Sequence, residues 1–155
     1  MDNNIYIEVS VLDDVFKLAQ NLRLDDIREA AALNLTPEQA LLRGFVLSEE
    51  CYSVKFKGTV IGMFGVAKYN MPDGFGSVWF FGSDECTNHP FTFVKGGIKY
   101  TKTWLQKYDI LINAVDSRNT SHISWLRSIG MTISNPIMIN GFEFLQFYKV
   151  REKDV

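Results

Sequence analysis

The chain has 155 residues, about the size of one domain, and can bury a single sizeable hydrophobic core. Hydrophobic residues make up 46% of it and charged residues 22%, which is typical of a soluble globular protein and excludes a disordered chain. A formal net charge of -2 provides no general attraction for nucleic acid or an anionic membrane. We therefore predict one domain over residues 1–155 that binds neither.

The two cysteines and the first residues indicate a reducing compartment. Cys51 and Cys86 are too few for a disulfide framework. The opening "MDNNIYIEVS" lacks the basic and apolar regions of a signal peptide, and no apolar run approaches the roughly 20 residues of a membrane helix. We expect a soluble cytoplasmic protein.

The N-terminal third predicts a strand and then helical structure. Residues 4–11 alternate and are rich in β-branched side chains, which indicates a strand. From Asp13 the apolar residues follow helical spacing, but Asp26 falls within that series. The helix therefore either rolls to keep its apolar face or ends near Asp25 and restarts.

A second helix is signalled by "TPEQALLRGF", where Thr36 is the N-cap, Pro37 the first helical residue and Gln39 the end of a capping box. From Cys51 the period changes to two, and "CYSVKF", "KG" and "TVIGMFGVAKY" predict a hairpin. The almost wholly apolar "SVWFF", residues 77–81, predicts a central strand.

The rest of the chain predicts two strand–helix units and a hairpin. After the loop "GSDECTNHP", a helix runs from Pro90 to about Tyr108, weakened by Gly96 and Gly97. The strand "ILINAV" leads into a helix that ends at a glycine, and the last two strands meet at "NG", a strong hairpin signal.

This element order resembles the GNAT (Gcn5-related N-acetyltransferase) fold. "LINAVDSRNTSHISWLRSIGM" is similar to the fifth strand and fourth helix of that superfamily, in which an Asn opens the helix and Gly plus an apolar residue end it. Here these are Asn119, Gly130 and Met131. The resemblance implies an α/β (α+β) GNAT-like fold, with a mixed, mostly antiparallel sheet of about seven strands and about four helices.

A phage branch of the superfamily is the closer resemblance. The runs "LAQNLRLDDIREA", "GMFGV", "VWFFGSD", "NTSHISWLRSIG" and "GFEFLQF" are similar, in order, to the GNAT-like internal virion proteins of short-tailed phages. The resemblance implies a phage virion or host protein as partner, and a location in the virion interior or the host cytoplasm.

The resemblance also implies acetyl coenzyme A as cofactor. Its pantetheine arm would contact the main chain of Phe80, Phe81 and Gly82, and Asn119 would contribute to the same site. Enzymatic members hold the pyrophosphate in a Gln/Arg-x-x-Gly-x-Gly/Ala loop, a nest of amides at a helix N-terminus. That motif is absent, and the nearest substitute is Lys95 with Gly96 and Gly97 in "VKGGI".

The catalytic positions also depart from the family. Enzymatic members often carry a Tyr seven positions after the Asn, where this chain has Leu126. Tyr148 or Tyr100 remains as a general acid, and Glu85, Asp84 or Asp116 as a general base. The catalytic candidates that we retain are Asn119, Tyr148 and Glu85.

His122 shares a helical stripe with Trp125, Leu126 and Ile129, which favours packing over catalysis. We expect a neutral, half-buried imidazole hydrogen-bonded to a carbonyl or to a carboxylate such as that of Asp116.

Two further clusters carry weaker signals. Cys86 and His89 are too few for a zinc site, so we expect no metal. Arg23, Asp26 and Glu29 lie where acetyltransferases shape the acceptor pocket, but we expect them to form a solvated helix face.

The missing glycine-rich loop and Leu126 favour a phage GNAT-fold protein whose enzymatic motifs have decayed, acting inside the virion or on a host partner. The alternative is an active acetyl-CoA-dependent N-acetyltransferase that modifies a host or phage protein or a small amine.

Overall fold

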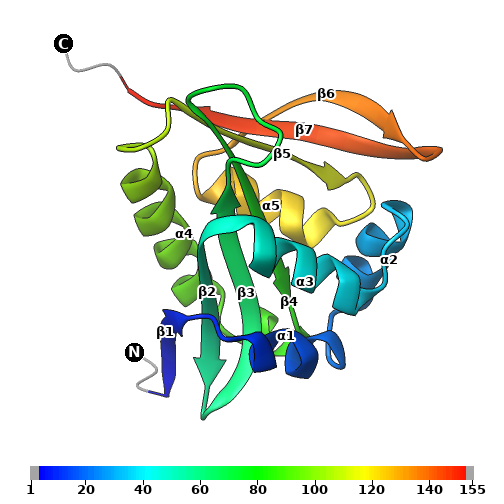
Figure 1. The fold of residues 1–155 in the computed structure, drawn as a ribbon, viewed down its shortest axis with the longest axis vertical. Helices are drawn as coiled ribbons and strands as arrows, with labels where there is room; N and C mark the ends of the chain where they lie inside the picture. Colours follow the sequence, from blue (N-terminus) through cyan, green and yellow to red (C-terminus); the bar gives the residue numbers. More distant parts are fainter. Residues whose placement is uncertain (1–3, 153–155) are drawn as a thin grey trace.

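The computed structural model describes residues 4–152, which form one seven-stranded sheet with helices on both faces (Figure 1). The strands are β1 (Ile5–Val9), β2 (Ser48–Phe56), β3 (Thr59–Ala67), β4 (Phe75–Gly82), β5 (Ile110–Asp116), β6 (Thr132–Ile139) and β7 (Phe142–Val150). The helices are α1 (Leu12–Ala19), α2 (Leu24–Ala32), α3 (Pro37–Leu47), α4 (Pro90–Trp104) and α5 (Thr120–Ser128), with a short 3-10 helix η1 (Asp84–Asn88). The predicted fold class is confirmed, with five α-helices in the described residues instead of about four.

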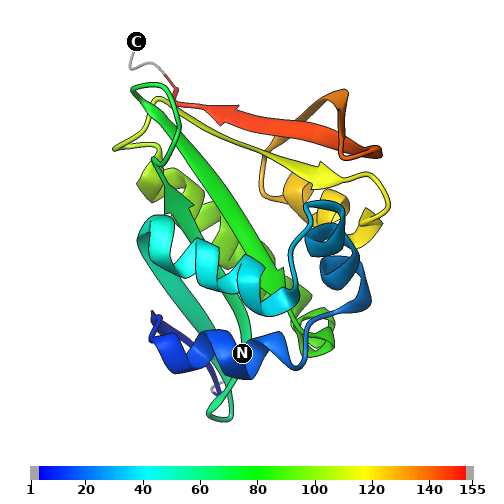
Figure 2. The same ribbon diagram turned by 45° about the vertical axis from the view of Figure 1, so that its right-hand side comes forward.

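The sheet has the order β1-β2-β3-β4-β5-β7-β6, so β4 is central, as its apolar sequence predicts. Figure 2 shows α1 and α3 in front of the sheet and α4 behind it. Both faces of the sheet carry a hydrophobic core, because alternate residues of each strand point to opposite faces. One packs Leu18 and Leu41 against Met63, and the other packs Leu111 against Trp104 on the α4–α5 side. A third, smaller cluster surrounds Val54, Ile61 and Cys86.

The first helical region is two helices, as the second sequence alternative predicts, but the break lies at residues 20–23 and Asp25 is inside α2. α1 ends at Ala19, and the chain then runs beside the end of β4 before α2 begins. Leu22 forms an isolated bridge with Ser83, and the Arg23 amide donates to the Gly82 carbonyl at 2.9 Å. The break therefore ties the start of α2 to the end of β4.

Two local predictions are confirmed and two elements differ from expectation. The Thr36 hydroxyl accepts from the Gln39 amide at 3.1 Å, as a capping box requires, and Asn140 and Gly141 turn the last hairpin with positive φ. α4 ends at Trp104 instead of near Tyr108, and η1 occupies the segment predicted as a loop.

β4 and β5 are parallel neighbours that separate along their length. Their backbones pair from Phe75–Ile110 to Ser77–Ile112 and no further. Beyond this point the Asn113 side chain bridges the strands, donating to the Val78 carbonyl at 2.7 Å. Beyond Ser77 and Ile112 the facing edges of β4 and β5 border an opening in the sheet, which we call the splay. A ligand can reach the backbone of the strands there.

Among residues 4–152, no helix is both long enough and apolar enough to span a membrane.

Candidate functional site

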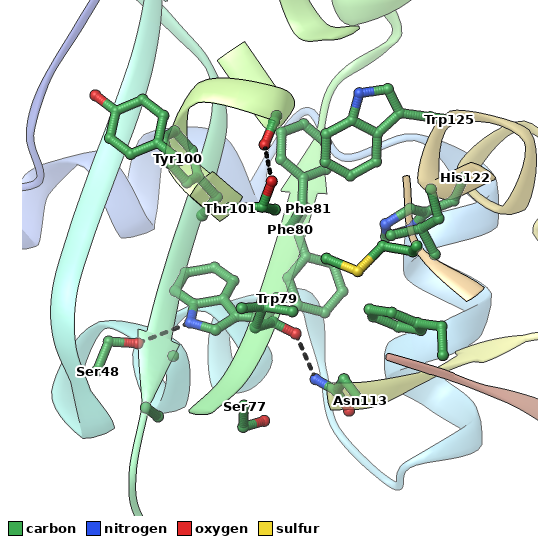
Figure 3. A pocket seen from close by; sticks show the side chains of 18 of the residues that line it. Ser48, Ser77, Trp79, Phe80, Phe81, Tyr100, Thr101, Asn113, His122 and Trp125 are labelled. Carbon is green, nitrogen blue, oxygen red and sulfur yellow. Dashed lines mark hydrogen bonds between the residues drawn. The ribbon is translucent and has the colours of Figure 1, made fainter. Parts of the chain in front are cut away.

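A cavity of about 430 Å³ lies at the splay and borders both faces of the sheet (Figure 3). Trp79 and Phe81 line it on the side of α3, whereas Phe80 and Tyr100 line it on the side of α4. Its wall is mostly apolar and rich in aromatic rings, as is typical of small-molecule sites, and its volume falls in their usual range.

The backbone of β4 presents one free position to the splay. The backbone groups of Gly82 and Val78 point to this edge, as their hydrogen bonds show. The Gly82 amide donates to Asp26 of α2, and the Gly82 carbonyl accepts from the Arg23 amide just before α2. The Val78 carbonyl accepts from Asn113. Phe80 lies between Val78 and Gly82 at a spacing of two, so its N–H and C=O face the splay as well. Of the three residues predicted to contact pantetheine, Phe80 alone offers such groups, since the Gly82 amide is already bonded.

Five residues from four elements form a buried cluster that we call the polar joint: Asp26, Glu29, Gly82, Asp116 and Asn119. Asp26 accepts hydrogen bonds from the Gly82 amide at 2.8 Å and from Asn119 Nδ2 at 3.0 Å. Glu29 accepts from the Asp116 amide at 2.8 Å. The joint thereby connects α2 to β4, β5 and the start of α5.

The prediction of a solvated face for Asp26 and Glu29 is wrong. The exposed fraction is 0% for Asp26 and 6% for Glu29, and Arg23 caps the joint with an ion pair of 2.9 Å to Asp26. The sequence held a signal for this burial, because Asp26 interrupts an otherwise apolar helical series. An acidic side chain in an apolar series is buried when hydrogen-bond donors or a cation lie beside it in the fold.

The two other carboxylates of the polar joint have opposite pKa shifts. Burial raises the pKa of Glu29 to about 8, so this side chain is largely protonated at neutral pH. Burial also disfavours the charged form of Asp116, but hydrogen bonds from Arg118 outweigh it and lower the pKa. Glu29 is thus a neutral acid in the cavity wall, and Asp116 is an ion paired towards solvent.

A second group, which we call the aromatic cluster, fills the space between α4 and α5. It consists of Phe80, Phe93, His122 and Trp125. The Phe80 ring lies 5.3 Å from Trp125 and 6.0 Å from His122, centroid to centroid, and Trp125 Nε1 donates to the Phe93 carbonyl at 3.0 Å. These contacts bind β4, α4 and α5 together over the splay.

His122 packs, as its helical spacing predicts, but without the expected hydrogen bond. Its exposed fraction is 7%, and burial lowers its pKa to about 4, so the imidazole is neutral. Neither ring nitrogen bonds to a described residue, and the carboxylate of Asp116 binds Arg118 instead.

The segment between β4 and α4 differs from a phosphate-binding loop. η1 begins with Asp84 and Glu85, and Pro90, the first residue of α4, has no amide hydrogen to donate. Lys95, Gly96 and Gly97 lie further along α4. A Cβ on Gly97 would meet Ile129 at 2.7 Å, whereas one on Gly96 would have nothing closer than 4.0 Å.

These features decide how well acetyl coenzyme A fits. The splay, the cavity and the backbone of Phe80 suit a pantetheine arm, which is neutral and forms amide hydrogen bonds. The acidic η1 and the start of α4 do not suit a pyrophosphate, because carboxylates repel it and glycine amides are missing there.

The predicted catalytic residues belong to three different elements. Asn119 is the N-cap of α5, but its side chain bonds to Asp26 and caps no amide. Tyr148 lies in β7 opposite Ile112, and Glu85 in η1 accepts from Asn88. No hydrogen bond or ion pair between described residues joins any two of the three candidates. Leu126 has an exposed fraction of 2% and is part of the α4–α5 core.

Within residues 4–152, no three His, Cys, Asp or Glu side chains are grouped so that they could hold a metal ion. Cys86 is buried, and burial raises the pKa of its thiol to about 12.

Solved structures define the class of this fold. The chain is similar to a GNAT-family acetyltransferase from Bacillus anthracis, with a TM-score of 0.71, 11% identity and coverage of 99% of this chain and 98% of that one. It is also similar to yncA, a putative acetyltransferase from Salmonella typhimurium solved with acetyl-CoA, with a TM-score of 0.64, 13% identity and coverage of 98% and 96%. The ribosomal-protein-S5-alanine acetyltransferase from Vibrio fischeri gives a TM-score of 0.66 at 16% identity, with 97% and 95% covered. The chain therefore has the GNAT fold.

A family model assigns the chain more narrowly. The model described as "Bacteriophage T7, probable scaffold protein Gp13" matches residues 50–136, which is more than half of the chain. The chain belongs to this phage family. A comparison with curated proteins finds no match.

Proposed function

We propose that this chain is a phage protein that works through protein contacts, inside the virion or with a host partner, on a GNAT fold that no longer recognises an acetyl donor. One observation carries the proposal. The segment from β4 to α4 holds an acidic 3-10 helix and a proline, with Asp84, Glu85 and Pro90 at the place where a pyrophosphate would need amides.

The physical reason is electrostatic. A helix N-terminus favours anions through its free amides and its dipole, and each contribution is weakened here. Pro90 removes one donor, and two carboxylates lie in the preceding turn. A donor with several phosphate charges gains little at such a site.

The family description supports the choice of partner. The family model is described as a probable scaffold protein of bacteriophage T7, and the word scaffold points to protein contacts. Such contacts suit an internal virion or host-interaction role for this chain, in the virion interior or the host cytoplasm.

Quantitative mass spectrometry of purified particles, made by the phage that encodes the chain, tests this role. We expect a fixed number of copies per particle, or a stoichiometric partner when the tagged chain is captured from infected cells. A phage replication enzyme measured in parallel controls for carry-over. Absence from particles together with capture of no stoichiometric partner would contradict the proposal.

An acetyl-CoA-dependent N-acetyltransferase acting on a protein or small amine is the second candidate. The observation that favours it is the cavity at the splay, where the backbone of Phe80 faces the space that a pantetheine arm would take. Incubation with acetyl-CoA labelled in the acetyl group, in extracts of uninfected and infected cells, tests it. Labelled product that depends on the protein would establish transfer, and none at saturating donor would exclude it.

A further inference from the structure

The cavity at the splay has its most exposed rim beside α3. Among the described residues that line it, Arg43 of α3 and Tyr69 of the β3–β4 connection are the only exposed ones. The rest of the wall is buried or half-buried, and the aromatic cluster covers the α4–α5 side. A ligand would therefore enter past Arg43 and Tyr69 and extend towards the splay.

The interior of the cavity is uncharged. Glu29 and His122 are buried ionisable side chains of the wall. Both are largely neutral near pH 7, since burial raises the pKa of Glu29 to about 8 and lowers that of His122 to about 4. Aromatic and aliphatic side chains form most of the remaining surface. Such an interior accepts an apolar group and rejects a charged one.

The mouth of the cavity carries one unpaired charge. Arg43 makes no ion pair with a described residue, although acidic and basic side chains pair at many other places on the surface. A guanidinium binds a carboxylate through two parallel hydrogen bonds, a geometry that lysine cannot match. The cation at the mouth and the neutral interior together define the polarity of a ligand.

We propose that this cavity binds an apolar carboxylate, with its alkyl chain inside the splay and its carboxylate at Arg43. The volume of about 430 Å³ supports a medium-length chain, since a cavity of about 150 Å³ already holds benzene. The ligand needs no nucleotide or phosphate, so the proposal does not depend on the assembly role or on acetyl-CoA.

A series of head groups on one alkyl chain tests the polarity of the site. Decanoate, decan-1-ol and decyltrimethylammonium are titrated into the full-length protein with calorimetry as the readout. The two ionic ligands are kept below their critical micelle concentrations, and the alcohol is kept below its solubility limit. Decanoate should bind about tenfold more tightly than the alcohol, because a charge-assisted hydrogen bond adds that much, and the cation should bind most weakly. Equal affinities, tighter binding of the cation, or no binding of decanoate would overturn the proposal.

Matched variants locate the two ends of the ligand. Arg43→Gln should lower decanoate affinity to that of the alcohol and leave the alcohol unchanged, whereas Arg127→Gln, an exposed arginine on α5, should change neither. Ala114→Leu fills the cavity wall and should weaken both ligands, with circular dichroism reporting its folding. Retained decanoate preference in Arg43→Gln would overturn the proposal whatever the filled variant does.

Discussion

The polar joint and the aromatic cluster both lie beside the β4–β5 splay, but they are held together by different forces. The polar joint consists of directional hydrogen bonds to the oxygens of buried acidic side chains, so loss of one group leaves others without partners. The aromatic cluster consists of ring contacts at 5.3–6.0 Å, which tolerate a change of chemistry better than a change of size. The polar joint occupies the backbone amide at the end of β4, whereas the aromatic cluster packs on the Phe80 ring and leaves the Phe80 backbone facing the splay.

Asp26→Ala should have the largest effect on stability. The substitution leaves the Gly82 amide, Asn119 and Arg23 without their shared hydrogen-bond acceptor. Water cannot replace it easily, because the exposed fraction of Asp26 is 0%. We expect a loss of about 3–5 kcal/mol in the free energy of unfolding, measured by urea denaturation. The control is Asp25→Ala, whose carboxylate is partly exposed and 3.8 Å from Arg28, with an expected change below about 1 kcal/mol. Similar losses in both variants would contradict the polar joint.

Two adjacent glycines of α4 test whether the packing between α4 and α5 depends on the size of the side chains there. Gly97→Ala should destabilise by about 1–3 kcal/mol, because its Cβ would meet Ile129 at 2.7 Å and Trp125 at 3.0 Å. Gly96→Ala should stabilise by up to about 1 kcal/mol, because its Cβ enters open space and alanine favours helix. The two variants are compared by thermal and urea unfolding, and the same sign of change in both would be inconsistent with close packing at Gly97.

Trp125→Phe separates the one hydrogen bond of the aromatic cluster from its packing. The indole donates to the Phe93 carbonyl at 3.0 Å, and a phenyl ring keeps most of the contact with Phe80. We expect a loss of about 1 kcal/mol. Trp125→Ala, measured alongside, should cost about 3–5 kcal/mol, and equal losses would mean that packing contributes little.

Glu29→Gln should alter how the free energy of unfolding depends on pH. At low pH, where Glu29 is protonated in both the folded and the unfolded state, the variant should change stability less. The folded protein holds the Glu29 proton up to about pH 8, whereas a free glutamate releases it near pH 4.5, so the free energy of unfolding falls as pH rises through this range. Glutamine is neutral throughout and keeps an oxygen for the Asp116 amide, so the variant should lose less stability between these pH values. His122, neutral above about pH 4, affects the acid side equally in both proteins. Parallel curves would rule out a buried neutral Glu29.

Much of the fold could be predicted from the sequence because its signals are local. The capping box at Thr36, the Asn140-Gly141 turn and the alternating strands each depend on neighbouring residues, and each is confirmed. Local signals do not decide the break between α1 and α2, because it depends on contacts with Gly82 and Ser83, about 60 residues away along the chain.

The site was harder to predict because its partners are distant in sequence. Asp26 and Glu29 look like an ordinary charged face until Gly82, Asp116 and Asn119 are brought beside them. The role of Trp125 over Phe80 likewise arises from two elements that meet only in the folded chain. In contrast, the absence of a glycine-rich loop after β4 is a property of the sequence itself.

Calorimetric titration of acetyl-CoA tests the central claim most directly. The protein, its Gly96→Glu variant and yncA from Salmonella typhimurium, whose structure contains acetyl-CoA, are titrated in the same buffer. We predict saturable binding by yncA and no measurable heat of binding for this chain up to millimolar donor. Saturable binding by this chain that Gly96→Glu abolishes would contradict the account.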